Sequence, residues 1–178
     1  MRKDKIIEMI KTNPIVIKNI ENPSDEMKLI AIKKDGMMLR YIKNPTREIE
    51  DLAIKNNPRA IEFIVKPTYD MEKYVVSKLW NTLELIENPL EELILIGLKQ
   101  KGYAIKYFKN PSEKLQEIAI EKDYDSIKYI ENPSEKIQLL AIRKNYVALR
   151  YIKNATLDVE VLSVCINESA IKFIENIN

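Results

Sequence analysis

The hydrophobic and polar positions of this chain follow a pattern that returns every 22 residues, and the stretch from Tyr129 to Asn145 shows one period clearly. The dipeptide Asn-Pro marks the period at residues 22–23, 44–45, 88–89, 110–111 and 132–133, and Lys66-Pro67 and Asn154-Ala155 fill the remaining slots. With the proline slot as position 1, the chain divides into eight repeats that begin at Met1, Pro23, Pro45, Pro67, Pro89, Pro111, Pro133 and Ala155. A fixed period of this length is typical of a solenoid, in which each repeat packs only on its neighbours.

The first half of each repeat predicts an α-helix of about 12 residues, or roughly 18 Å. Asparagine at position 22 and proline at position 1 are interpreted as the N-cap and the first helical residue. Acidic residues follow early, and four of them stand at position 3, where an Asn-x-x-Glu capping box needs them: Asp25, Glu91, Glu113 and Glu135. Lysine and arginine gather at positions 11 and 12 and a turn signal follows, so the helix is expected to end there.

This helix carries apolar residues on two sides. Positions 5, 8 and 9 share one face, as Leu115, Ile118 and Ala119 do, while position 10 points away from them and is apolar in every repeat. A helix that is apolar on two sides is sandwiched between neighbours, and the mostly small residues at position 9 allow those neighbours to approach closely. Stacked repeats would build a rod or an arc, whereas a compact bundle would need irregular connections.

Positions 15 to 21 predict a second, shorter element that is anchored at positions 17 and 20, as by Ile127 and Ile130. A spacing of three fits one face of a helix, and about seven residues can form either an α-helix or a short 3-10 segment. The sequence therefore predicts an all-α fold. We expect an α-solenoid of eight two-helix repeats, with a right-handed superhelix favoured, that spans residues 1–178 as a single domain.

The units Asn-Pro-Ser-Glu…Ala-Ile-x-Lys-Asn-x-x-Ala-Leu-x-Tyr-Ile resemble a 22-residue helical repeat family of unknown function that occurs in phage, giant-virus and bacterial proteins. The resemblance covers nearly the whole chain. It implies an origin in a mobile element or its host, but it transfers no activity and no functional residue. The short second element is also similar to that of leucine-rich-variant and HEAT-like α-solenoids, although leucine-rich-variant repeats are slightly longer.

Composition and charge narrow the class of protein without indicating a partner. Apolar residues make up 46% of the chain and charged residues 31%, which is typical of a globular or repeat protein rather than a disordered one. The net charge of +2 gives no strong attraction to nucleic acid or to a membrane surface. A single cysteine excludes an internal disulfide, and the chain has neither a signal-peptide-like start nor a run of about 20 apolar residues, so we expect a cytoplasmic protein.

The residue types that most often carry catalysis are missing or isolated. The chain has no histidine, which removes the commonest general base and the commonest metal ligand. It has no glycine-rich phosphate loop and no nucleophile elbow, and its carboxylates recur with the repeat, as helix capping and solvation require. We therefore expect no enzyme activity, no catalytic residue, no cofactor and no metal site.

Large apolar residues interrupt the usual polar positions in the middle of the chain. They are Val65, Tyr69, Leu79, Trp80, Leu90 and Ile94. Since apolar residues at surface positions mark contact surfaces, we predict a partner-binding patch here, called the mid-chain patch. The alternative is a local irregularity in which Trp80 folds inward beside Gly97.

The C-terminal repeat carries an apolar stripe on what should be the solvent side of its first helix. Leu157, Val161 and Cys165 fall at i, i+4 and i+8, and Ile166 adjoins them. Because end repeats normally carry a polar cap, the stripe predicts an end-on interface that is covered by a second copy or by a partner. The alternative is modest fraying with a few exposed aliphatic side chains. Cys165 has no expected cationic neighbour and is not predicted to be reactive.

Position 18 forms a basic ladder along the second elements, which comprises Lys18, Arg40, Lys106, Lys128, Arg150 and Lys172. Glu62 and Glu84 interrupt it, and an aromatic residue often follows at position 19. Basic and aromatic residues together could track a nucleic-acid backbone or bind another anion. Glutamates at position 21, such as Glu131, balance much of this charge and favour a solvated, ion-paired face.

These features predict a non-enzymatic repeat scaffold that binds a protein or a peptide. The family resemblance implies a product of a phage or other mobile element that acts on a host factor. The alternative function is nucleic-acid or anion binding along the basic ladder. Neither a membrane nor a cofactor is expected as a partner, and a homodimer through the C-terminal repeat stays open.

Overall fold

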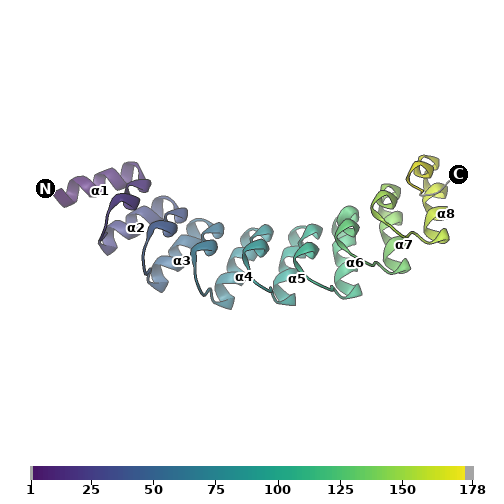
Figure 1. The fold of residues 1–178 in the computed structure, drawn as a ribbon, viewed down its shortest axis with the longest axis horizontal. Coiled ribbons are helices and arrows are strands. Elements are labelled where there is room, and N and C mark those ends of the chain that lie inside the picture. The colour runs from purple at the N-terminus through teal and green to yellow at the C-terminus, as the bar shows by residue number, and fades with distance from the viewer. Residues whose placement is uncertain (1, 175–178) are drawn as a thin grey trace. The chain divides into compact units, whose positions relative to one another are not determined.

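The computed structural model describes residues 2–174 and confirms the all-α repeat fold over those residues (Figure 1). Within them, eight α-helices alternate with eight short 3-10 helices, and no strand is present. The α-helices are α1 Arg2–Thr12, α2 Asp25–Lys34, α3 Arg47–Asn56, α4 Tyr69–Lys78, α5 Glu91–Gln100, α6 Glu113–Lys122, α7 Glu135–Lys144 and α8 Leu157–Ile166. The 3-10 helices are η1 Pro14–Asn19, η2 Gly36–Tyr41, η3 Pro58–Phe63, η4 Trp80–Leu85, η5 Gly102–Tyr107, η6 Tyr124–Tyr129, η7 Tyr146–Tyr151 and η8 Glu168–Phe173.

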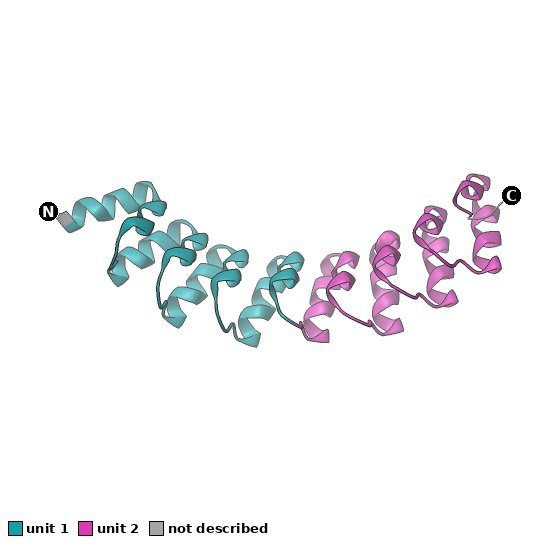
Figure 2. Ribbon diagram, in the orientation of Figure 1, with its two compact units in different colours: residues 1–87 teal, residues 88–178 magenta. Residues whose placement is uncertain are grey.

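The chain forms two compact units, which Figure 2 shows in teal and magenta. The first comprises residues 1–87 and holds α1 to η4, and the second comprises residues 88–178 and holds α5 to η8. Inside each unit, every repeat packs on the repeats beside it in the sequence, as α2 does on α1 and α3, and as α7 does on α6 and α8. That residues 1–178 form a single domain stays a prediction.

The predicted N-terminal cap of the α-helices is wrong, because serine or threonine at position 2 forms the cap instead of asparagine at position 22. The cap hydroxyl accepts a hydrogen bond of 3.3–3.4 Å from the backbone N–H three residues on, as seen for Ser24, Thr46, Thr68 and Ser112. The asparagine serves the turn before the helix, and three of the six described asparagines at this position adopt a left-handed backbone with φ of 48°, 52° and 54°: Asn44, Asn88 and Asn110. Consequently α2 to α8 begin at position 3 and have 10 residues instead of 12, and no Asn-x-x-Glu capping box forms.

Leu90 stands at the cap position of α5 and makes no side-chain cap hydrogen bond. We expect Leu90→Thr to raise the free energy of unfolding by about 1 kcal/mol, since the threonine hydroxyl can accept from the N–H of Leu93 as Thr46 does from that of Ile49. Leu90 is 59% exposed, so its removal costs little packing. Leu90→Ala is the control that removes the same side chain without adding a cap. Equal stabilities of the two variants in urea unfolding would contradict this account of the cap.

The second element is a 3-10 helix of six residues in all eight repeats, which decides between the two forms that the sequence left open. In five repeats an Asn or Asp at position 13 starts it by accepting a hydrogen bond from the backbone N–H two residues on: Asn13, Asp35, Asn57, Asn145 and Asn167. The residue after it is extended and donates its N–H to the carbonyl three residues back, as Ile130 does to Ile127. Side chains three apart therefore lie on one face, which brings position 17 into the core.

Two positions of the repeat contribute large, buried side chains to the core. Position 10 of the α-helix is 0–2% exposed in the first seven repeats: Ile10, Ile32, Ile54, Val76, Leu98, Ile120 and Ile142. Position 17 of the 3-10 helix is 1–2% exposed in the same repeats: Ile17, Leu39, Ile61, Leu83, Ile105, Ile127 and Leu149. On the other side of the α-helix, positions 5 and 9 are also buried, as Leu115 and Ala119 are, so the predicted burial of the helix on two sides is confirmed. Among the described residues, no helix is long and apolar enough to cross a membrane.

Candidate functional site

The residues of the mid-chain patch have very different exposures. Val65 is 93% exposed and Leu90 is 59% exposed, whereas Tyr69, Leu79 and Trp80 are half-buried. Val65, Tyr69, Leu79 and Trp80 belong to the first unit, and Leu90 and Ile94 belong to the second. Because its residues are divided between the two units, the mid-chain patch is not a surface of either unit alone.

Ile94 was expected in that patch, but it is fully buried, and the prediction for this residue is wrong. The reason lies in position 6 of the repeat, which is at the edge of the core. Gln138 at this position is 6% exposed, and Glu50 and Glu72 are half-buried. An aliphatic side chain there has no polar end to keep in water, so it turns fully inward.

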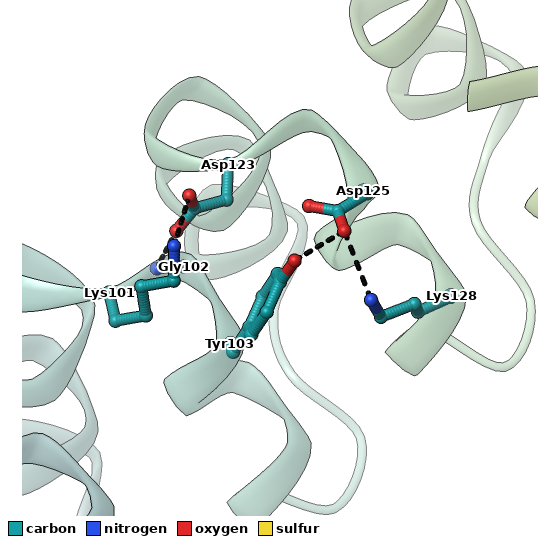
Figure 3. Close-up of polar contacts among 6 residues, drawn as sticks. All are labelled: Lys101, Gly102, Tyr103, Asp123, Asp125 and Lys128. Carbon is teal, nitrogen blue, oxygen red and sulfur yellow. Dashed lines mark hydrogen bonds and ion pairs between the residues drawn. The ribbon is translucent and has the colours of Figure 1, made fainter. Parts of the chain in front are cut away.

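The basic ladder is built into polar and aromatic contacts of the chain itself, and the second unit shows this around Lys128 (Figure 3). The ammonium of Lys128 lies 3.0 Å from Asp125 Oδ2, which also accepts a hydrogen bond from the hydroxyl of Tyr103 in the preceding repeat. Lys128 Nζ also lies 4.4 Å from the ring centroid of Tyr103, 5.1 Å from that of Tyr129 and 5.5 Å from that of Tyr151. One cation thus links three successive repeats.

The same contact recurs along the ladder in the first unit. The ammonium of Lys18 lies 5.9 Å from the ring centroid of Tyr41, and the guanidinium of Arg40 lies 5.4 Å from that of Phe63. Each of these rings stands at position 19 of the following repeat. Cation–π contacts of this kind stabilise by about 0.5–1 kcal/mol at exposed sites. Lys18, Arg40 and Lys128 of the ladder thus connect neighbouring repeats.

The charges around Asp125 shift one another's pKa values. Partial burial raises the pKa of the Asp125 carboxyl, but the hydrogen bonds from Tyr103 and Lys128 outweigh it, so the pKa lies below its ordinary value. Burial likewise lowers the pKa of Lys128, and its hydrogen bond and charge contact with Asp125 reverse the effect and raise it. The hydrogen bond to Asp125 raises the pKa of Tyr103. The cluster is therefore a charged ion pair near neutral pH.

Asp125→Asn should lower the free energy of unfolding by about 1–2 kcal/mol at neutral pH, because it removes the charge that Lys128 and Tyr103 share. The pKa of Asp125 is depressed in the folded state, so its contribution is present above its ordinary value of 3.8 and is lost as the pH falls through the folded value. The difference in the free energy of unfolding between wild type and variant should thus shrink at low pH. Glu131→Gln, at an exposed site just after η6, is the control. A difference that stays constant down to low pH would contradict the pairing.

The predicted stripe of the C-terminal repeat is exposed. Leu157 is 73% and Val161 is 52% exposed, and Cys165 and Ile166 are exposed beside them on α8. A shallow groove of about 250 Å³ runs along this side and is lined by Leu157, Glu160, Val161, Val164, Cys165 and Ile174. Its walls are aliphatic apart from Glu160 and the thiol of Cys165. A small aliphatic groove without paired charges suits contact with another apolar surface.

Three residues of this groove side were not predicted as functional, because their repeat positions are those of core residues. Val164 and Ile171 stand at positions 10 and 17, which read as core because they are apolar in every repeat. In the first seven repeats both positions are at most 2% exposed, whereas Val164 is half-buried and Ile171 is 53% exposed. Ile174 at position 20 is also half-buried. We call the six residues Leu157, Val161, Val164, Cys165, Ile171 and Ile174 the C-terminal apolar face.

The first helix, α1, exposes polar side chains where the other α-helices carry apolar ones. Positions 5 and 8 are apolar in the other seven repeats, but α1 carries Lys5 and Glu8 there, and both are exposed. A polar residue at these positions keeps an end helix soluble without a neighbour. The described surfaces of α1 and α8 thus differ, since α1 exposes polar residues at positions 5 and 8, whereas α8 exposes the C-terminal apolar face.

The fold places this chain in the class of all-α repeat solenoids. Comparisons of the chain with protein-family models, curated proteins and solved structures found no match. The resemblance to a repeat family of phage, giant viruses and bacteria therefore stays a prediction, as does the host factor that it implies. The function has to be inferred from the residues of the chain itself.

Proposed function

We propose that this protein is a non-enzymatic repeat scaffold that binds a protein or a peptide through its C-terminal apolar face. One observation carries the proposal: Leu157 and Val161 are 73% and 52% exposed at rim positions, where stacking does not require an apolar residue. At the same two positions α6 carries Glu113 and Glu117. Charges at exposed positions favour solubility, so exposed aliphatic side chains in their place indicate a contact surface.

The physical basis of binding would be the removal of this face from water. Full burial of one leucine or valine side chain stabilises by about 1.5–3 kcal/mol, and several neighbouring aliphatic residues can act as a joint anchor. Glu160 lies in the groove wall and can fix the orientation of a partner through a hydrogen bond. This arrangement supplies affinity and orientation, which are the properties of a docking surface.

The proposal is tested by selecting binders from an unbiased library of displayed peptides. We expect the wild-type chain to enrich peptides that lose binding to the variant Leu157→Lys/Val161→Lys, because two ammonium groups make the face polar. The matched control is Asp51→Lys/Lys73→Glu, which changes charges at exposed or half-buried rim positions of the first unit and should leave binding intact. Enrichment only of peptides that bind wild type and the face variant equally would overturn the proposal.

Nucleic-acid or anion binding along the basic ladder is the alternative function, and the contacts of Lys128 argue against it. A cation that already pairs with Asp125 and packs on three tyrosine rings releases little free energy on meeting a phosphate. We expect a mobility-shift titration with single-stranded and double-stranded DNA and RNA to stay flat at low salt. Binding that falls steeply with salt and is lost in Lys106→Glu/Arg150→Glu would reverse the ranking of the two functions.

A further inference from the structure

The edge of one α-helix pairs with the next α-helix at fixed positions of the repeat, and α6 and α7 show this pairing in full. Positions 3, 7 and 11 of α6 lie one turn apart and carry Glu113, Glu117 and Glu121. Lys136, at position 4 of α7, forms ion pairs with Glu113, at 2.9 Å, and with Glu117. Lys144, at position 12 of α7, forms one with Glu121. The edge at positions 3, 7 and 11 therefore faces positions 4 and 12 of the next helix.

The same register occurs in the first unit with other chemistry. Lys3, at position 3 of α1, pairs at 3.0 Å with Glu26, at position 4 of α2, so the two signs are exchanged. Arg47, at position 3 of α3, contacts the sulfur of Met71, at position 5 of α4, at 3.2 Å. Since ion pairs of either sign join positions 3 and 4 of adjacent helices, this register belongs to the stacking geometry, and the Arg47 contact lies one position further along. The chemistry of each edge must then match the helix that covers it.

On α8 this edge is apolar throughout, because Leu157, Val161 and Cys165 take the places of the three glutamates of α6. We propose that the partner of the C-terminal apolar face is an amphipathic α-helix, docked on α8 in the register of α7 on α6, with apolar side chains where α7 carries Lys136 and Lys144. This inference rests on the proposed function and names the kind of partner. A lysine of the partner at either of these two positions would lose water from its ammonium group and would find no carboxylate to pair with.

The rest of the partner helix follows from the buried face of α7. Ile137 and Ala141, at positions 5 and 9, are fully buried, and α7 packs on α6. A helix that covers Val164 in the same way needs an aliphatic residue and, four residues later, a small one. The expected partner helix thus carries four apolar residues with the spacing of residues 136, 137, 141 and 144 of α7. The residue that corresponds to Ala141 is small. This is a helix-in-groove mode of recognition.

The α1 helix of a second copy does not meet this requirement. It carries Asp4 at position 4 and Lys5 at position 5, where the face asks for two apolar residues. Docking would bury the ammonium of Lys5 against aliphatic side chains and bring the carboxylate of Asp4 to Leu157, and both charges would lose water. Head-to-tail stacking of copies through α1 is therefore disfavoured.

The test measures fluorescence anisotropy as the full chain is titrated into two labelled peptides. The first has the native sequence of residues 133–152, and the second has the same sequence with Lys136→Leu and Lys144→Leu. We expect the wild-type chain to bind the second peptide at least about tenfold more tightly than the first. The chain variant Val161→Lys should lose this preference, which shows that the difference arises at α8 and not from a general affinity for apolar peptides.

A second chain variant tests the register itself. Leu157→Glu/Val161→Glu/Cys165→Glu gives α8 the edge of α6. It should prefer the native peptide, whose two lysines now find carboxylates, and this preference should weaken as salt is added. Equal binding of the two peptides by the wild-type chain, binding of neither, or the absence of a reversal in the triple variant would each overturn the inference.

These failures remain distinct from a failure of the proposed function. If displayed peptides still require Leu157 and Val161 but the two designed peptides do not behave as stated, the face binds protein and the helical register is wrong. If the free chain sediments as a dimer that Val161→Lys dissociates, the occupant is a second copy, and the separate helical partner is excluded. If no peptide depends on the face at all, both proposals fall.

Discussion

Replacing Ile142 with alanine is expected to lower the free energy of unfolding by about 2–5 kcal/mol, one of the two largest losses that we predict for a single substitution. Ile142 stands at position 10 of α7 and is fully buried, and α7 has a packed neighbour on each side, α6 and α8. Alanine removes three carbon atoms from this contact and leaves a cavity that helices on both sides would have to close. Urea unfolding followed by circular dichroism measures the loss.

The same position of the last repeat supplies a matched comparison. The variants Ile142→Val and Ile142→Ala differ by the change of valine to alanine at a buried position 10. We expect the alanine variant to have a free energy of unfolding about 2 kcal/mol lower than the valine variant. Val164→Ala makes the same change on α8, where the side chain is half-buried, and should cost about half as much or less. Equal costs at the two sites would mean that Val164 is covered in solution, which would contradict the open C-terminal apolar face.

The second large effect is expected at Gly102, where the backbone of η5 lies close to the next repeat. A β-carbon on Gly102 would stand 2.4 Å from the carbonyl oxygen of Ala119 and 2.6 Å from Ser126 Oγ. The carbonyl belongs to α6 and cannot turn aside, so the two repeats must separate. Gly102→Ala should therefore cost about 3 kcal/mol. It also disturbs the 2.7 Å hydrogen bond that the Gly102 N–H donates to Asp123 Oδ2 (Figure 3).

Glu168→Ala is the control for this substitution, because Glu168 occupies the same position 14 in the last repeat and is exposed. We expect it to change stability by no more than about 0.5 kcal/mol. Gly36→Ala should behave like Gly102→Ala, since a β-carbon there would stand 2.3 Å from the carbonyl oxygen of Ala53. A loss at Gly102 no larger than that at Glu168 would show that neighbouring repeats can move apart freely.

The repeat and its core could be predicted from the sequence because burial depends on position alone in a stack. Once the period was known, the apolar residues at positions 10 and 17 had to face neighbouring repeats, and Ile120 and Ile127 are buried in this way. The small residues at position 9 indicated close helices, and Ala119 and Ala141 are fully buried. These inferences needed only the side-chain periods of helices.

The helix start was mispredicted because two adjacent signals compete in several repeats, as in Asn110-Pro111-Ser112. Asn-Pro and Ser or Thr at position 2 can both begin a helix, and the sequence does not rank them. In the structure Ser112 caps α6, while Asn110 takes a left-handed turn with φ of 54°. The choice is set by where the preceding 3-10 helix ends and how the chain must turn, which is a property of the stack.

The candidate site was predicted only in part, for a related reason. Leu157 and Val161 could be found because they are apolar at rim positions. Val164 could not be separated from core residues by its type, since only the absence of a covering repeat exposes it. Ile94 shows the opposite error: its type suggested a surface patch, but its position lets an aliphatic side chain turn inward. Position in the stack decided both cases.

The most direct measurement of the central claim is the location of peptide binding on the intact chain. The methyl groups of isoleucine, leucine and valine are labelled, and their NMR shifts are followed as a peptide selected on the wild-type chain is added. We predict the largest shifts at Leu157, Val161, Val164, Ile171 and Ile174, and none at Ile17 or Leu39 in the first unit. Shifts centred on Ile105, Ile127 and Leu149, beneath the basic ladder, with Leu157 and Val161 unchanged, would contradict the account.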